Sequence, residues 1–251
     1  MKITGGDASP GAAVEKVVAG LDASPLPPGK CSNCASYGIC IMKDLSPEAS
    51  VEAGLLIEEH SFRKGDLLLR EGEHASHLRV IKVGTVYLGR IGSGGRINPV
   101  GIFGQGTIVG MCGYFGQPNQ LAAVAATSGR CCEISAHAVA SLARKDQKVW
   151  DQIGQAYCDT IGLLAKWTVA IRRPHIAGRV ASSLRLLSEV HRSLTVPLPS
   201  HMALAHLLGT TRESVARALA LLEVEGCITR QGGRVCAVMP APLAQWLSRQ
   251  P

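Results

Sequence analysis

Short apolar runs separated by glycines mark the middle of the chain, from about residue 60 to residue 135. Turn signals recur between the runs, as in Lys64-Gly65-Asp66 and Glu71-Gly72-Glu73. The four clearest runs are 66–70, 78–83, 85–90 and 131–134. Closely spaced short strands with glycine turns predict an antiparallel barrel or sandwich.

The pattern changes to helical spacing after residue 144. From about Lys145 to Arg172, apolar residues recur at steps of three and four, which predicts one long helix that Pro174 ends. A stripe of this length beside a small barrel favours a partner helix from a second copy of the chain, so we expect a homodimer. The alternative is a helix packed on its own barrel. The expected dimer seam is Trp150, Ile153, Tyr157, Ile161 and Leu164, with Thr168 and Ile171 continuing the stripe.

A helix-turn-helix pattern fills residues 199–223. A first helix ends at Leu208, Gly209 supplies a left-handed turn, and Thr210 or Thr211 caps the second helix. The second helix is expected to bury one face, made of Val215, Leu219 and Leu222. Residues 223–238 then predict a two-stranded wing that turns at 232–233.

The start of the second helix carries charged residues suited to reading bases. Arginine can donate two hydrogen bonds to guanine, and glutamate can accept one from cytosine. Because Glu213 and Arg217 are four apart, the alternative is a solvated salt bridge between them. The candidate DNA-contacting residues are Ser200, Thr211, Arg212, Glu213 and Arg217.

Composition fits a polyanionic partner. The 251 residues carry a net charge of +7, which favours a partner such as nucleic acid. Hydrophobic residues make up 46%, enough for packed cores.

No stretch reaches the roughly 18 apolar residues of a membrane span, and residues 1–20 lack the order of a signal peptide. We therefore expect a cytoplasmic protein with no membrane partner. Its nine cysteines are expected to be ligands, redox thiols or small core residues rather than disulfides.

Three cysteines stand within ten residues, as Cys31-x2-Cys34-x5-Cys40. Three thiolates so spaced can each reach one corner of a cubane iron–sulfur cluster, which needs a fourth ligand from elsewhere. A zinc site and a thiol redox switch are the alternatives. Three other cysteines lie on apolar patterns and are predicted to be core residues: Cys158, Cys227 and Cys236.

These motifs resemble the cyclic-AMP-receptor/fumarate-nitrate-regulator (CRP/FNR) superfamily over roughly residues 31–240. Residues 62–66, 69–73 and 78–84 look like its cyclic-nucleotide-binding-type jelly roll, and residues 180–225 look like its DNA-binding domain. The resemblance implies an α+β chain with a jelly-roll barrel, a long dimerisation helix and a winged helix-turn-helix. It also implies base reading by Glu213 and Arg217, a further base or phosphate contact from Arg212, and RNA polymerase as a partner. Ala216 stands where the fumarate-nitrate type has serine, which favours a half-site of the cyclic-AMP type.

The sensor region departs from the family's nucleotide binders. These use a Gly-Glu pair and an Arg-Ser pair, whereas residues 106–124 contain neither glutamate nor arginine. A phosphodiester would find no cation there, so we expect no cyclic AMP. The cysteine triad instead resembles the oxygen-sensing branch. That resemblance implies Cys132, in Cys132-Glu133-Ile134, as fourth ligand; Cys131 points to the opposite strand face, and Cys112 is a weaker candidate.

The domain organisation follows from these segments. We expect a mobile leader over 1–29, a cysteine-rich segment with a short helix over 30–58, and a barrel over 59–144. A dimerisation helix over 145–173 and a DNA-binding domain over 174–251 complete the chain.

The function that we expect is an oxygen- or redox-responsive transcription regulator. It would hold a cluster, [4Fe–4S] by resemblance, and bind double-stranded DNA with an inverted repeat. A nitric-oxide, haem or thiol sensor on the same scaffold is one alternative, and an iron–sulfur electron-transfer protein is another. The helix-turn-helix and the lack of a dinucleotide fingerprint weigh against electron transfer. No nucleophile–base–acid set indicates an enzyme.

Overall fold

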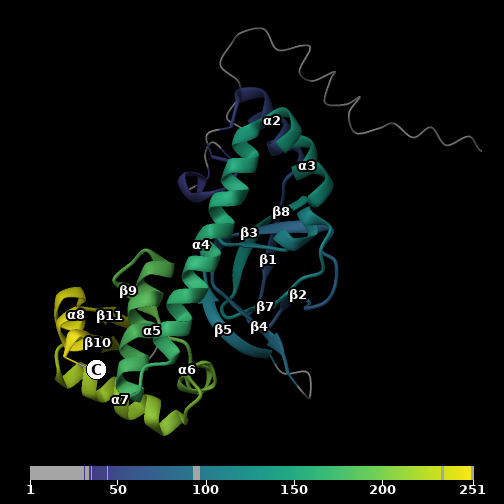
Figure 1. Ribbon diagram of the computed structural model, residues 1–251. Coiled ribbons are helices and arrows are strands. Elements are labelled where there is room, and N and C mark those ends of the chain that lie inside the picture. The colour runs from purple at the N-terminus through teal and green to yellow at the C-terminus, as the bar shows by residue number, and fades with distance from the viewer. Residues whose placement is uncertain are drawn as a thin grey trace, which may run out of the picture.

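The computed structural model describes residues 31, 34, 36–43, 45–92, 97–232 and 235–249; the predicted leader lies outside this part of the chain. Two four-stranded antiparallel sheets form the predicted jelly-roll barrel (Figure 1). The first sheet has the order β1 (Glu58–Phe62), β8 (Gly129–Ser135), β3 (His77–Val83) and β6 (Ile108–Val109). The second has the order β2 (Leu67–Leu69), β7 (Ala122–Ala125), β4 (Val86–Ile91) and β5 (Ile97–Phe103).

Both faces of the first sheet are covered. Its inner face carries Ile81 and Cys131 into the barrel core, because successive strand residues point to opposite sides. Its outer face carries Leu78 and Val80 into a second core, under helices. Those helices are α2 (Pro47–Leu56), α3 (Ala136–Lys145) and the first turns of α4 (Gln147–Ile171).

The long helix α4 confirms the predicted one within two residues at each end. The preceding helix α3 was not predicted. It is short, and its apolar stripe contains only two large residues, Val139 and Leu142, which are both buried. Asp146 separates α3 from α4. It ends the first helix and caps the second, accepting a hydrogen bond from the backbone N–H of Lys148.

The lower part of α4 packs on β5 through Trp167. This side chain is fully buried, and its indole N–H donates to the carbonyl of Ile102 at 3.1 Å. Gly101 makes the approach possible, because a Cβ at that position would lie 2.5 Å from Cδ1 of the indole ring. Among the described residues, no helix is long and apolar enough to cross a membrane.

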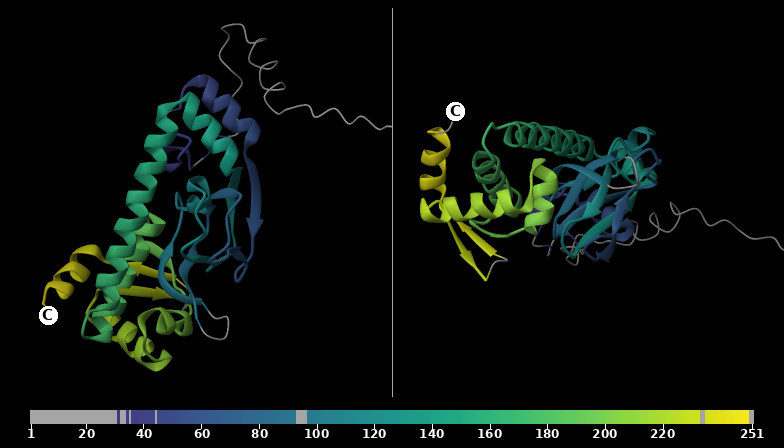
Figure 2. Two further views of the ribbon diagram at one scale, coloured as in Figure 1. Left: turned by 45° about the vertical axis from the view of Figure 1, so that its right-hand side comes forward. Right: turned by 90° about the horizontal axis from the view of Figure 1, so that it is seen from below.

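The C-terminal domain lies at the far end of α4 (Figure 2). It starts with α5 (Ile176–His191), whose apolar face is buried at Val180, Leu184, Leu187 and Val190. Next come β9 (Thr195–Pro197), α6 (His201–Leu208) and α7 (Arg212–Val224). The hairpin of β10 (Ile228–Gln231) and β11 (Val235–Val238) follows, and then α8 (Pro240–Ser248). Helix α8 was not predicted, and it buries Leu243, Trp246 and Leu247.

Asp146 generates the first testable prediction. One carboxylate oxygen accepts from the backbone N–H of Ser46 at 2.8 Å, while the other caps α4, so the residue joins the start of α2 to that of α4. We expect Asp146→Ala to lower the free energy of unfolding by about 1 kcal/mol in urea titrations. Asp151→Ala, on the exposed face of the same helix, should have a much smaller effect.

The same prediction has a pH dependence. The backbone N–H groups of Ser46 and Lys148 lower the pKa of Asp146 in the folded protein. Its contribution is therefore fully present above the unfolded-state pKa and is lost as the pH falls through the lower folded-state value. The difference between wild type and Asp146→Ala should narrow on acidification, and a constant difference would contradict this assignment.

Candidate functional site

The helix-turn-helix has the predicted geometry. Helix α6 ends at Leu208, and Gly209 adopts the left-handed conformation with φ of 61°. Of the two candidate caps, Thr211 is the one used: its side chain accepts a hydrogen bond from the backbone N–H of Ser214 at 3.2 Å. Ser200 caps α6 in the same way through the N–H of Ala203. Ser200 and Thr211, both candidate DNA-contacting residues, therefore cap the N-termini of the two helices.

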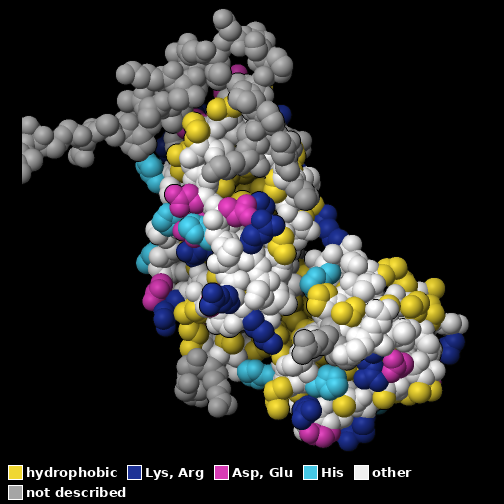
Figure 3. Space-filling model, turned by 180° about the vertical axis from the view of Figure 1, so that it is seen from behind, with side chains coloured by type: hydrophobic (Ala, Val, Ile, Leu, Met, Phe, Trp, Pro, Cys, Tyr) yellow, Lys and Arg dark blue, Asp and Glu magenta, His cyan; other side chains and the backbone are white. Residues whose placement is uncertain are grey.

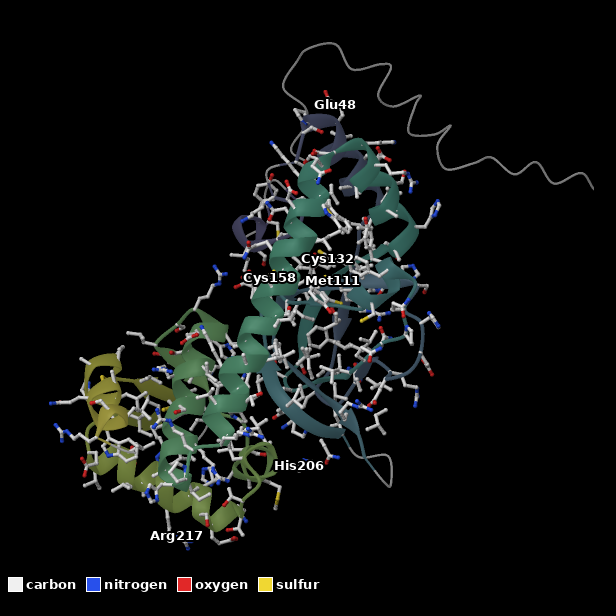
Figure 4. The ribbon with its side chains drawn as sticks, in the orientation of Figure 1. Glu48, Met111, Cys132, Cys158, His206 and Arg217 are labelled. Atoms are coloured by element: carbon white, nitrogen blue, oxygen red, sulfur yellow. The ribbon has the colours of Figure 1, made fainter. Side chains whose placement is uncertain are left out.

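The outer face of α7 carries the predicted base-reading residues. Arg212, Glu213 and Arg217 are all exposed, whereas the opposite face is buried at Val215, Leu219 and Leu222. Arg217 donates to the hydroxyl of Ser214 at 3.1 Å, and the ion pairs found among the described residues do not join it to Glu213. Arg217 lies at the end of the molecule opposite to Glu48 of α2 (Figure 4).

The wing is fixed to the end of α7 by one ion pair. The guanidinium of Arg230 on β10 donates to Glu223, and the backbone N–H of Arg230 donates to the other carboxylate oxygen at 3.0 Å. These contacts lower the pKa of Glu223. The predicted turn begins at Gly232, with φ of 57°, while residue 233 lies outside the described chain. Lys, Arg and His side chains outnumber carboxylates on the visible face of this domain (Figure 3).

The second site is a cavity of about 250 Å³ on the outer face of the first sheet. Cys31, Cys34 and Cys40 line it from the cysteine-rich segment, and Cys132 lines it from β8. The structure thus brings together the four predicted ligands. Cys131 is buried in the barrel core on the opposite face of β8, and Cys112 is not among the lining residues. The remaining lining residues are Ser36, Tyr37, Met42, Ile57, Glu59, Val80, Lys82 and Ile134.

Tight turns and buried side chains hold the cysteine-rich segment against the sheet. The backbone N–H of Cys34 donates to the carbonyl of Cys31, and that of Cys40 donates to Tyr37, where the short helix η1 (Tyr37–Ile39) begins. The buried hydroxyl of Ser36 accepts from Gln105 at 2.8 Å and donates to a carbonyl of β3 at 3.4 Å. Ile41 and Met42 follow directly and are each 2% exposed in the outer core.

The thiols of this cavity influence one another. Burial, the largest cause, together with the charges of the other three cysteines, raises the pKa of Cys132 to about 12, while Lys82 acts in the opposite direction. The pKa of Cys40 is also raised, mainly by burial. The thiolate forms therefore need a neighbouring positive charge or a bound cation. Among the described residues, no three His, Cys, Asp or Glu side chains form a group that could hold a single metal ion.

The other cysteines fulfil the core prediction only in part. Cys227 and Cys236 are 1% and 0% exposed, in agreement with it. Cys158 is exposed on α4, so its prediction as a core residue is wrong. It lines an open cavity of about 660 Å³ between α4, the cysteine-rich segment and the end of α5. Its apolar neighbours in sequence belong to the exposed stripe of α4, which the pattern alone does not distinguish from a buried face.

The stripe expected to form the dimer seam is exposed at three of its five positions. Trp150, Tyr157 and Ile161 are 43%, 45% and 51% exposed, and Leu164 is partly buried. Ile153 is 1% exposed and packs in the outer core of its own chain, so its prediction as a seam residue is wrong. Helix α4 has two adjacent apolar faces. The exposed one passes through Gly154 instead, four residues after Trp150 and seven before Ile161.

Comparisons with known protein families match both domains. The model of the cyclic nucleotide-binding domain matches residues 59–146, and the model of the Crp-like helix-turn-helix domain matches residues 178–246. The first range covers the barrel with α3, and the second covers α5 through most of α8. The two matches together span more than half of the chain.

Individual relatives match most of the chain. The probable transcriptional regulator flp of Lacticaseibacillus casei is 27% identical over 197 residues, which cover 78% of this chain and 90% of that protein. The structure of FixK2 from Bradyrhizobium japonicum is similar with a TM-score of 0.66 and 23% identity, covering 77% of this chain and 96% of that one. A CRP-family transcriptional regulator from Thermus thermophilus gives a TM-score of 0.61 at 19% identity, covering 75% of this chain and 96% of that one.

The structure agrees with the two family matches. A barrel occupies the range of the first match, and a helix-turn-helix with an exposed, capped second helix occupies the range of the second. Similarity to the solved structures establishes the fold, and the two family models establish the type of regulator. The chain belongs to the CRP/FNR family of transcriptional regulators.

Proposed function

We propose that this regulator responds to oxygen or redox state through an iron–sulfur cluster, of the [4Fe–4S] type, bound by Cys31, Cys34, Cys40 and Cys132. The observation that carries the proposal is the single cavity that these four side chains share. Three of them are close in sequence, and the fourth arrives from a strand more than 90 residues later.

The chemistry of the cavity fits such a group. Thiolates are the usual ligands of iron–sulfur clusters. A cavity of about 250 Å³ has the volume of several water molecules, at about 30 Å³ each, so it has room for a group of several atoms. Apolar side chains, among them Met42, Ile57 and Val80, complete its walls and limit the access of water. A bound cluster would supply one-electron chemistry and sensitivity to oxygen.

The route from this cavity to DNA passes through α4. Ile41 and Met42, next to Cys40, share one core with Val149 and Ile153 on the inner face of α4. The exposed stripe of the same helix is available to a second copy of the chain. Loosening of the cysteine-rich segment would remove apolar contacts beneath α4 and so weaken dimerisation. Because a dimer joins two half-site contacts, a modest change in dimerisation free energy changes DNA affinity steeply.

At the DNA end, we propose that two symmetry-related α7 helices read an inverted repeat in double-stranded DNA. Arg217 and Glu213 would contact base edges, and Arg212 a base or a phosphate. RNA polymerase is the further partner that the family resemblance implies. Cyclic AMP is not expected to act as effector, because residues 106–124 contain no glutamate or arginine. Zinc, haem, nitric oxide or thiol oxidation at the same cavity would be distinguished by metal content and spectrum.

The cysteine assignment is tested by single serine variants of the four lining cysteines. Each variant, purified without oxygen, should lose most of its iron, sulfide and visible absorption, because a thiolate ligand is missing. Cys158→Ser, a matched change at an exposed cysteine, should keep them. Full iron content in Cys132→Ser with loss in Cys112→Ser would overturn the choice of fourth ligand. Zinc in place of iron and sulfide, or saturable binding of cyclic AMP in calorimetry, would favour another kind of sensor.

The seam on α4 is tested by Ile161→Glu. This side chain is half exposed in one chain, so the fold should persist, but a charge buried in a symmetric interface is costly. We expect the dimer dissociation constant measured by sedimentation to rise about 100-fold or more. Gln155→Glu adds the same charge to α4 outside the stripe and should leave the dimer intact. If both variants sediment as wild type does, the interface lies elsewhere.

Base reading is tested by Arg217→Ala. A bidentate arginine–guanine contact contributes about 1–3 kcal/mol of discrimination, so preference for the selected sequence over random DNA should fall roughly 5- to 150-fold. The control is Arg185→Ala, which removes an exposed arginine from α5. Selection from randomised DNA gives the measurement. If Arg217→Ala selects the same motif with the same preference, Arg217 does not read bases and only makes its hydrogen bond to Ser214 within α7.

A further inference from the structure

The cysteine-lined cavity contains one basic side chain, that of Lys82, among its described lining residues. Glu59 is its one carboxylate in the same set. Neither residue belongs to the cysteine motif, and sequence analysis did not single out either of them. Both come from strands of the first sheet, which places them on the floor of the cavity.

Strand register sets these side chains beside Cys132. Glu59 of β1 is the pairing partner of Cys132 on one side, and Val80 of β3 is its partner on the other. Lys82 lies two residues after Val80, where the register of β3 with β8 shifts, and its side chain lines the same cavity as Val80. The lysine, the carboxylate and the thiol therefore occupy one face of three adjacent strands.

The position of the Lys82 ammonium is fixed by contacts. Its Nζ donates to Glu59 Oε2 at 2.5 Å, and the side chain is 17% exposed. The other oxygen of Glu59 accepts from Arg130 at 2.7 Å. The carboxylate is thus shared between two cations, Lys82 in the cavity lining and Arg130 outside it, so Glu59 alone does not fully neutralise Lys82. The carbonyl of Lys82 also accepts the hydrogen bond from Ser36 that holds the cysteine-rich segment to β3.

Charge is the property that this arrangement controls. Four thiolates give an iron–sulfur centre a net negative charge, and reduction adds another electron. A nearby cation stabilises the reduced form more than the oxidised form, and it does so more strongly in a partly buried site than in water. Hydrogen bonds and charge around the sulfurs are known determinants of the potentials of such centres.

We infer that Lys82 is the counter-charge of the cysteine site, raising the reduction potential of the centre held there, and that Glu59 positions its ammonium. This inference rests on the proposed function. It assigns the tuning of the sensor to a residue outside the ligand set.

The test compares Lys82→Met, Lys82→Arg and Arg130→Met with wild type, all loaded anaerobically. Redox titration followed by visible absorption gives the midpoint potentials, and iron and sulfide are counted in the same samples. We expect Lys82→Met to lower the equilibrium constant for one-electron reduction about tenfold or more, which is about 59 mV. Lys82→Arg should restore most of this loss. Arg130→Met removes the other cation of Glu59, outside the cavity lining, and should have a smaller effect.

The outcomes separate the two proposals. Wild type without iron and sulfide would refute the proposed function itself. A loaded wild type with an unchanged potential in Lys82→Met would overturn the inference alone, as would an equal shift in Arg130→Met. If Lys82→Met folds by circular dichroism but fails to hold iron, rescue by Lys82→Arg supports the inference, and failure of the arginine variant to hold iron overturns it.

Discussion

The alternation of side chains along β8 is the constraint on which the rest of the structure depends. Cys131 faces the barrel core and Cys132 faces the cysteine-rich segment, so this one strand contributes side chains to two separate hydrophobic cores. A shift of one residue in the pairing with β1 or β3 would exchange these faces and would remove the fourth thiol from the cavity. The pairing of Cys132 with Glu59 and Val80 thus determines both the fold and the site.

Helix α4 joins that site to the rest of the protein because it has two apolar faces. One face, through Val149 and Ile153, belongs to the core that also holds Ile41 and Met42. The other, through Trp150 and Ile161, remains exposed in the single chain. The packing of the barrel domain and the exposed stripe proposed for dimerisation are therefore properties of the same helix.

Local signals made much of this predictable from sequence. Gly209 and Thr211 specify the turn and cap of the helix-turn-helix by their own conformational preferences, and the cysteine spacing identified the site. Predictions failed where tertiary packing decides. The sequence spacing of Ile153 fits the predicted seam. In the folded chain, however, its side chain is buried in the outer core. Cys158 was predicted as a core residue, but no part of the barrel that the structure describes covers its side of α4. The position of Lys82 beside Cys132 becomes visible only when the three strands are paired.

The seat of Trp167 on β5 has a mechanical consequence. The indole ring fits over Gly101 and is tied to the carbonyl of Ile102, so displacement of α4 along its own axis would separate the ring from both. The other end of the helix, through Val149 and Ile153, packs in the core that holds Ile41 and Met42. The Trp167 indole therefore fixes the position of α4 along its axis close to the C-terminal domain, at the end of the helix opposite to the cysteine-rich segment.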